Sequence, residues 1–122
     1  MLSCKNNMSL IRDYFNKTVK YKNEHGDKTL VLMQVGAFYE VYGLKNKTTG
    51  EITGSSIESF SQFCDLNISE KKVCVNKQGV VMAGFRDYVL DKYLKKIVEN
   101  NYTAVVYSQD EKAAGTTRSR TG

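Results

Sequence analysis

The sequence predicts an α+β fold in which one mixed β-sheet is flanked by about three helices. Short, mostly apolar runs typical of strands buried on both faces occupy residues 29–35, 80–83 and 103–107. Stripes of apolar residues at helical spacing lie between these runs, so helices are expected to pack on the sheet. The chain has 122 residues, of which 41% are hydrophobic and 25% charged, which suits a single folded domain.

The first element is expected to be an amphipathic helix that has Ser9 as its N-cap and stops at Gly26. The polar segment 1–8 before it is expected to be loose. The predicted inner stripe of this helix recurs every three or four positions and consists of Leu10, Ile11, Tyr14, Phe15, Thr18, Val19 and Lys22.

A buried strand over residues 29–35 is expected to end at Gly36, and residues 45–50 are expected to form an exposed turn. A second helix follows, with Ser55 or Ser56 as its cap. The apolar side of that helix consists of Ile57, Phe60, Phe63 and Cys64.

The second half of the chain is expected to add strands and one more helix. Residues 65–75 predict one strand or two short strands, with 69–72 as a polar turn. Residues 76–79 predict a hairpin-like break, and the strand over 80–83 is expected to stop at Gly84. Asp87 is the expected cap of a third helix. The apolar stripe of the third helix consists of Val89, Leu90, Tyr93, Leu94, Ile97 and Val98.

The last strand is expected over residues 103–107, after a helix end at Asn100 and Asn101. From Ser108 onward the sequence turns polar, and residues 112–122 have almost no apolar content. The domain is therefore expected to span residues 9–111, followed by a flexible, basic tail over residues 112–122.

Charge and cysteine content restrict the kinds of site that the chain can carry. Eighteen Lys and Arg against 13 Asp and Glu give a net charge of +5, which fits a polyanionic partner. Neither a phosphate-binding loop nor a dinucleotide-binding glycine pattern is present, so no nucleotide-hydrolysing module is expected. Cys4, Cys64 and Cys74 have no zinc spacing, and His25 alone cannot complete a metal site, so reduced thiols in an intracellular protein are expected. No apolar run is long enough to span a membrane.

The segment from Gly36 to Glu40 is the most unusual in the chain. Phe38 follows a buried strand, a glycine and the small Ala37, so its ring could project from the end of the sheet instead of into it. Glu40 would point to the same side in an extended chain. The alternative is that Phe38, Tyr39 and Tyr42 belong to the core and that Glu40 is solvated.

Residues 36–40, Gly-Ala-Phe-Tyr-Glu, resemble the Gly-x-Phe-Tyr-Glu signature in the N-terminal domain of MutS, the DNA mismatch-recognition protein. The preceding strand at 32–35 is similar to the family's buried strand. Val81-Met82-Ala83-Gly84 resembles the family's Pro-Met-Ala-Gly, and residues 93–98 resemble its Tyr-Leu-x-Lys-Leu-Val helix. Residues 105–109 match the following strand more loosely. The resemblance runs from about residue 9 to residue 118.

Two phrases of the sequence, residues 83–88 and 106–111, look closer to the branch of this family found in giant viruses and soft-coral mitochondria. Two departures from the family pattern stand out. Ala37 replaces the usual Asp of bacterial members, and residues 86–88, Arg-Asp-Tyr, replace the Pro-Tyr-His that follows Met-Ala-Gly.

The resemblance implies a DNA-binding role for named side chains. Phe38 would enter the minor groove and stack on a mispaired base, and Glu40 would form a hydrogen bond with that base. Arg86 could contact a phosphate. The remaining residues expected at the DNA interface are Gly36, Tyr39, Lys45 and Lys47.

The resemblance also implies what this chain would not carry. The family's ATPase, with its ATP and Mg²⁺, lies in another domain, so no cofactor and no catalytic residue are expected here. The expected partner is double-stranded DNA with mismatched bases. Dimerisation is expected through domains absent from the sequence, and the chain is not expected to bind a membrane. The tail would lead towards a connector domain. Reduced cysteines are compatible with three compartments: the cytoplasm, a viral factory and the mitochondrion.

Two alternatives remain open from the sequence. Asp65, Glu70 and Lys72 weakly resemble the two carboxylates and the lysine of metal-dependent nucleases, in which the acids hold a divalent ion. The second alternative is a recruitment domain that keeps the fold but does not bind DNA.

Overall fold

A computed structural model describes residues 3–108 and 117–120, with side chains described over residues 8–108. Within these residues the chain forms three α-helices, one 3₁₀ turn and seven strands. Their order is α1 (Ser3–His25), β1 (Thr29–Val35), β2 (Phe38–Lys45), β3 (Ile52–Thr53), α2 (Ile57–Cys64), β4 (Ser69–Val75), β5 (Gln78–Arg86), η1 (Asp87–Val89), α3 (Leu90–Glu99), β6 (Thr103–Tyr107) and β7 (Thr117–Arg120).

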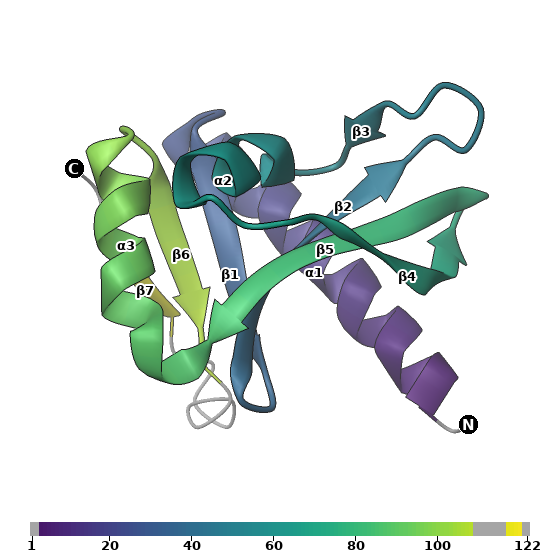
Figure 1. Cartoon of the computed structure of the whole chain (residues 1–122), viewed down its shortest axis with the longest axis horizontal. Coiled ribbons are helices and arrows are strands. Elements are labelled where there is room, and N and C mark those ends of the chain that lie inside the picture. Colours follow the sequence, from purple (N-terminus) through teal and green to yellow (C-terminus); the bar gives the residue numbers. More distant parts are fainter. Residues whose placement is uncertain (1–2, 109–116, 121–122) are drawn as a thin grey trace.

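The strands form one sheet in the order β4–β5–β2–β1–β6–β7. The short strand β3 stands outside this order and pairs with the last two residues of β2. β1 and β6 are parallel, whereas the other pairs are antiparallel. Figure 1 shows α1 crossing one face of the sheet and α2 and α3 covering the opposite face. The predicted α+β fold, a mixed sheet flanked by three helices, is confirmed.

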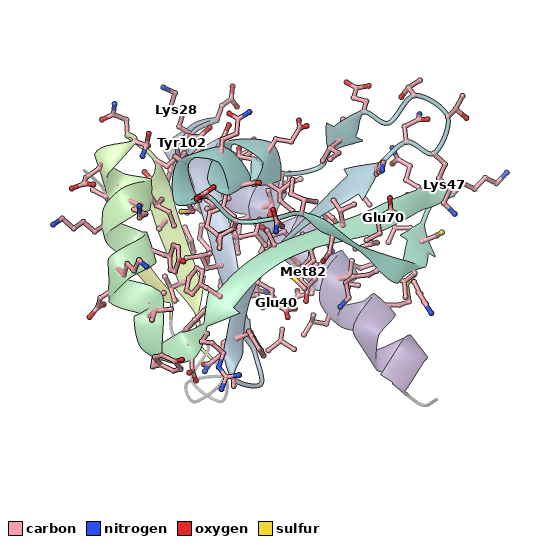
Figure 2. The ribbon with its side chains drawn as sticks, in the orientation of Figure 1. Lys28, Glu40, Lys47, Glu70, Met82 and Tyr102 are labelled. Atoms are coloured by element: carbon pink, nitrogen blue, oxygen red, sulfur yellow. The ribbon has the colours of Figure 1, made fainter. Side chains whose placement is uncertain are left out.

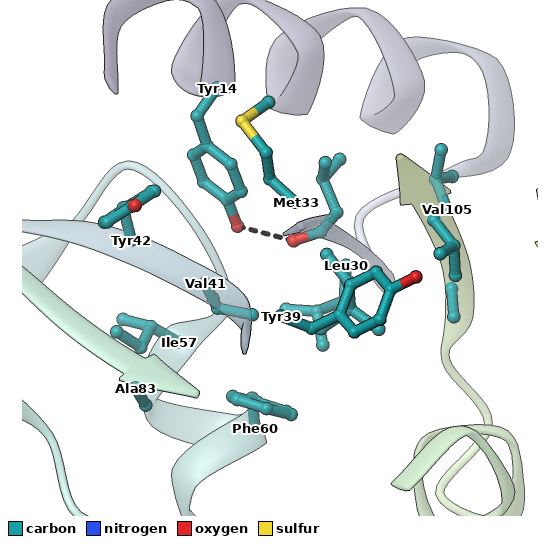
Figure 3. Packing of buried hydrophobic residues seen from close by; sticks show 14 of the residues in the cluster. Tyr14, Leu30, Met33, Tyr39, Val41, Tyr42, Ile57, Phe60, Ala83 and Val105 are labelled. Atoms are coloured by element: carbon teal, nitrogen blue, oxygen red, sulfur yellow. Dashed lines mark hydrogen bonds between the residues drawn. The ribbon is translucent and has the colours of Figure 1, made fainter. Parts of the chain in front are cut away.

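The core lies on both faces of the sheet and holds β2 firmly in place. On the α1 side, the buried Tyr14 hydroxyl donates to the Val31 carbonyl oxygen at 2.8 Å, and the Tyr14 and Tyr42 rings meet edge to face at 5.2 Å (Figure 3). On the other side, the Tyr39 ring of β2 lies 6.0 Å from the Phe85 ring of β5, which in turn stacks on Tyr93 of α3 at 4.4 Å. Because aromatic pairs of this kind add to the stability that burial provides, β2 is anchored through both faces.

The strands over 29–35 and 103–107 are confirmed, and each is buried along most of its length because the sheet is covered on both sides there. The second helix begins where Ser55 and Ser56 predict. The Ile57 N–H donates to Ser55 Oγ at 3.2 Å, which satisfies one of the free donors at the helix start.

Two predictions for the first helix are wrong. The helix begins at Ser3, so Ser9 lies inside it and part of the segment 1–8 is helical, because residues 3–8 contain neither Gly nor Pro to stop the helix. Val19, predicted to face inward, is 60% exposed. The buried positions are Ile11, Tyr14 and Thr18, and Val19 lies about 100° around the helix from Thr18.

The polar turn predicted over residues 69–72 is wrong, because these residues belong to β4. The strand predicted within residues 65–75 is present as β4, and the break predicted over residues 76–79 is confirmed: the chain reverses at Asn76 and Lys77, whose positive φ angles of 51° and 68° match a two-residue type I′ hairpin. One side of β4 is exposed, and its charged residues therefore do not prevent it from pairing as a strand.

The ends of three other segments also differ from the predictions. β5 continues past Gly84 to Arg86, and β2 is a full strand over residues that the sequence left without an assignment. Residues 117–120 of the expected flexible tail form β7, which pairs with β6. Residues 112–116 and 121–122 of that tail lie outside the described residues. In the described part of the chain, no helix is both long enough and apolar enough to cross a bilayer.

Candidate functional site

The turn between β1 and β2 sets the position of Phe38. Val35 pairs with Phe38, so Gly36 and Ala37 form a two-residue hairpin loop. The φ of +61° at Gly36 fits the first central position of a type II′ turn, where glycine avoids the strain of a left-handed backbone. The Asp87 N–H donates to the Ala37 carbonyl oxygen at 2.8 Å, which ties this turn to the start of η1.

Phe38 is the first residue of β2, and its side chain is 40% exposed. Its cross-strand neighbour is Arg86, whose guanidinium carbon lies 5.2 Å from the centre of the Phe38 ring. The ring is therefore accessible at the end of a rigid strand and is not enclosed in the core. The other aromatic residues of the segment, Tyr39 and Tyr42, are core residues, with exposed fractions of 4% and 1%.

Tyr39 points to the opposite face of the sheet from Phe38, because neighbouring residues of a strand alternate. Its hydroxyl lies 2.9 Å from Ser108 Oγ, and its ring packs near Phe85. Tyr39 therefore anchors β2 and does not belong to the exposed surface on which Phe38 lies.

Glu40 lies on the same side of β2 as Phe38 and is half-buried. The Tyr42 hydroxyl donates a hydrogen bond to Glu40 Oε1. Burial raises the pKa of Tyr42 far above its usual value, and the bond to Glu40 and the carboxylate charge raise it further. The hydroxyl therefore stays protonated, and this donor from the core fixes the orientation of the carboxylate.

Phe38 and Glu40 border a shallow groove along β2, β5 and the start of β4. Gly84 pairs with Glu40, and a Cβ atom at position 84 would come within 2.5 Å of the Tyr39 carbonyl oxygen. Glycine is required there because a side chain would push β5 away from β2. The residues that line the groove are Phe38, Glu40, Asn67, Ser69, Met82, Ala83 and Gly84.

Residues 86–88 continue the same surface past the end of β5. The Arg86 guanidinium carbon lies 5.8 Å from the centre of the Tyr88 ring, and Tyr88 is 78% exposed. Gln34 Nε2 donates to Asp87 Oδ2 at 3.4 Å, which holds the segment against β1. Arg86 is among the site residues that the sequence predicts, whereas Tyr88 is not. A signal for it was available, because Tyr88 precedes the apolar stripe of the third helix and has no place in that stripe.

Lys45 and Lys47, also expected at the interface, lie at the opposite end of β2 from Phe38. At about 3.3 Å per residue, Lys45 is about 23 Å along the strand from Phe38. Figure 2 shows Lys47 and Glu70 well away from Glu40. Lys45 Nζ binds Glu70 Oε2 at 2.8 Å, and Lys47 Nζ donates to Cys74 Sγ at 3.1 Å. The hydrogen bond and charge of Lys45 hold the pKa of Glu70 below its usual range.

The acidic residues of the nuclease alternative do not form a metal site in the described residues. Asp65 has a left-handed backbone at the C-cap of α2, and the Glu70 carboxylate is bound to Lys45. Among the residues that the structure describes, no three His, Cys, Asp or Glu side chains gather to hold an ion. Cys64 and Cys74 are free thiols, and burial raises the pKa of Cys64 to about 11. The side chain of Cys4 lies outside the described residues.

Comparison with known proteins gives two findings. The sequence model of the family MutS domain I matches residues 14–121. A mutS homolog named as a DNA mismatch repair protein in Acanthamoeba polyphaga mimivirus is 30% identical over 108 residues, which cover 88% of this chain and 9% of the viral protein. The chain therefore spans less than a tenth of the length of that relative.

Proposed function

The chain belongs to the MutS domain I family, and from that premise we propose that it binds duplex DNA in mismatch repair by inserting Phe38 beside a mispaired base. The observation that carries this proposal is the exposed Phe38 ring at the end of β2. A type II′ turn precedes the ring, a bond from Asp87 holds that turn, and the aromatic core anchors the strand behind it.

The energetics of insertion explain how such a ring would recognise a mismatch. Inserting an apolar side chain between base pairs costs a few kcal/mol of unstacking and kinks the duplex. A mismatched base has already lost part of its pairing and stacking, so the same deformation costs less there. Phe38 would therefore respond to how easily the duplex deforms instead of reading which bases are present.

Glu40 would increase this selectivity through its charge. A carboxylate near the phosphates is repelled by every duplex, whether matched or mismatched. A displaced base that donates an N–H to Glu40 gives a hydrogen bond in return, which a paired base cannot offer. The bond from Tyr42 positions the Glu40 carboxylate next to the groove beside Phe38.

Basic side chains would supply affinity that does not depend on sequence. Arg86, next to Phe38, is proposed to bind a phosphate at the inserted step. Lys45, about 23 Å along β2 from Phe38, and Lys47 just beyond that end of the strand are proposed to bind phosphates farther along the duplex. No reaction is proposed for this chain, and the ATP hydrolysis of the family is assigned to other domains.

The proposal is tested by measuring the affinity of the full chain for a matched duplex and for the same duplex with one mismatch. Phe38→Ala is expected to reduce the preference for the mismatch about tenfold or more, since stacking contributes about 1–3 kcal/mol per base. Val19→Ala is the matched control, because Val19 is also exposed and apolar but lies on α1. Thermal unfolding checks that both variants fold.

Three outcomes would contradict the proposal. A Phe38→Ala variant that discriminates as well as the wild type would exclude Phe38 as the inserted side chain. A wild type that binds both duplexes equally would exclude mismatch recognition by this chain. A wild type that binds neither duplex would favour the recruitment alternative.

A further inference from the structure

Tyr88 is exposed on a backbone that is held in place. It lies in η1, between Asp87, which bonds to the Ala37 carbonyl oxygen, and Val89, which packs against the core. The ring is nevertheless 78% exposed and contributes little to the core. A rigid aromatic side chain loses little conformational entropy on binding, so such residues are common in recognition surfaces.

Arg86 connects this ring to Phe38. Its guanidinium carbon lies 5.2 Å from the centre of the Phe38 ring and 5.8 Å from the centre of the Tyr88 ring. The three side chains form one exposed row in the order aromatic, cation, aromatic. Among the described residues the remaining large apolar side chain with high exposure is Val19, which lies on α1 and is not part of this row.

The chemistry of these three side chains fits nucleotides that lie close together along one duplex. A guanidinium can stack on an aromatic ring and still donate hydrogen bonds from its edge to a phosphate. The centres of the two rings lie 5.2 and 5.8 Å from one guanidinium carbon and are therefore at most about 11 Å apart. Base pairs repeat about every 3.4 Å, so the two rings can reach nucleotides within about three steps of each other on one duplex. An aromatic ring that packs on a base contributes about 1–3 kcal/mol without reading its sequence.

We infer that Tyr88 is a second aromatic contact to DNA, packing against a nucleotide within about three base pairs of the step that Phe38 opens, while Arg86 binds a phosphate between them. This inference rests on the proposed function and extends it to a residue outside the Phe-x-Glu signature. The contact would use the residues that replace the family's Pro-Tyr-His in this chain.

The test compares Tyr88→Ala with Tyr88→Phe in the full chain, on matched and mismatched duplexes that carry 2-aminopurine beside the mismatch position. Tyr88→Ala is expected to weaken binding to the mismatched duplex about tenfold and to abolish the quenching of 2-aminopurine that the wild type produces. Tyr88→Phe keeps the ring and is expected to retain both properties. Val19→Ala is the control for loss of an exposed apolar side chain elsewhere.

The outcomes separate this inference from the proposed function. If Tyr88→Ala binds and quenches as the wild type does, or if Tyr88→Phe is as weak as Tyr88→Ala, the stacking contact is excluded, whatever Phe38 does. If the wild type binds both duplexes equally, the proposed mismatch recognition is excluded. The Tyr88 contact to DNA would still be supported in that case if Tyr88→Ala lost the 2-aminopurine quenching and Tyr88→Phe kept it.

Discussion

The two ends of β2 differ in how their side chains are engaged. At one end, the exposed Phe38 ring contacts the Arg86 guanidinium, and the nearby Glu40 carboxylate is held by the Tyr42 hydroxyl. At the other end, Lys45 is bound to Glu70 and Lys47 to Cys74. The first end therefore presents an aromatic surface built on a fixed frame, whereas the second presents charges that already have partners on the protein.

This difference suggests a division of labour along one strand. Aromatic insertion depends on how easily the duplex opens, so changes at the Phe38 end should alter the ratio of affinities for mismatched and matched DNA. Phosphate contacts are present in every duplex, so changes at the lysine end should alter both affinities together. Substitutions at matched positions on β2 and its neighbours can separate these two effects.

The largest effect is expected from Gly84→Ala, next to Glu40. Its Cβ atom would meet the Tyr39 carbonyl oxygen at 2.5 Å, so β2 and β5 must move apart. We expect a loss of about 1–3 kcal/mol in the free energy of unfolding and a loss of mismatch preference. Urea denaturation and duplex binding measure the two quantities.

Gly79→Ala is the matched control for this substitution, because Gly79 lies on the same strand at the lysine end. The nearest atom to its added Cβ would be Lys47 Cε at 3.6 Å, an ordinary van der Waals distance. This variant is expected to keep the mismatch preference of the wild type. Equal losses of stability and preference in both variants would show that the frame around Glu40 has no special role.

A smaller effect is expected from Glu40→Gln, which removes the charge and keeps the shape. Affinity for the matched duplex is expected to rise about fivefold, corresponding to about 1 kcal/mol of charge repulsion, and the preference for the mismatch is expected to fall. Glu70→Gln removes the same charge at the lysine end and is expected to raise both affinities equally. A Glu40→Gln variant with unchanged affinity for matched DNA would contradict the role of charge repulsion.

The fold was more predictable from the sequence than the site. The strands over 29–35 and 103–107 were recognisable because burial on both faces leaves a continuous apolar run. β4 was only partly predictable: a strand was expected within residues 65–75, but charges such as Lys71 and Lys72 on an edge strand with one exposed side made its first half resemble a turn. The break over residues 76–79 was recognisable from its polar residues and glycine, whereas the left-handed angles at Asn76 and Lys77 are not specified by composition.

The local sequence pattern allowed Phe38 to be exposed but did not decide it. From composition alone Phe38 resembles Tyr39 and Tyr42, which are buried. The family resemblance separated Phe38 from them, and the type II′ turn at Gly36 gives the physical reason. The sequence marks Tyr88 only as an aromatic residue outside the apolar stripe of the third helix, and its place beside Arg86 depends on how β5 ends against the β1–β2 turn.

The smallest effect is expected from Lys47→Ala, and it sharpens the contrast between the two ends of β2. The hydrogen bond that Lys47 donates goes to a thiol, so binding a phosphate costs it less than it costs Lys45, which must leave its direct bond to the Glu70 carboxylate. We expect affinity to fall about twofold for matched and mismatched duplexes alike, and the slope of log affinity against log salt to decrease by about one. Lys95→Ala, an exposed lysine on α3, removes the same charge elsewhere and should leave the slope unchanged. If Lys47→Ala changed the preference for the mismatch without changing the salt slope, the lysine end would take part in discrimination, and the division of labour along β2 would be wrong.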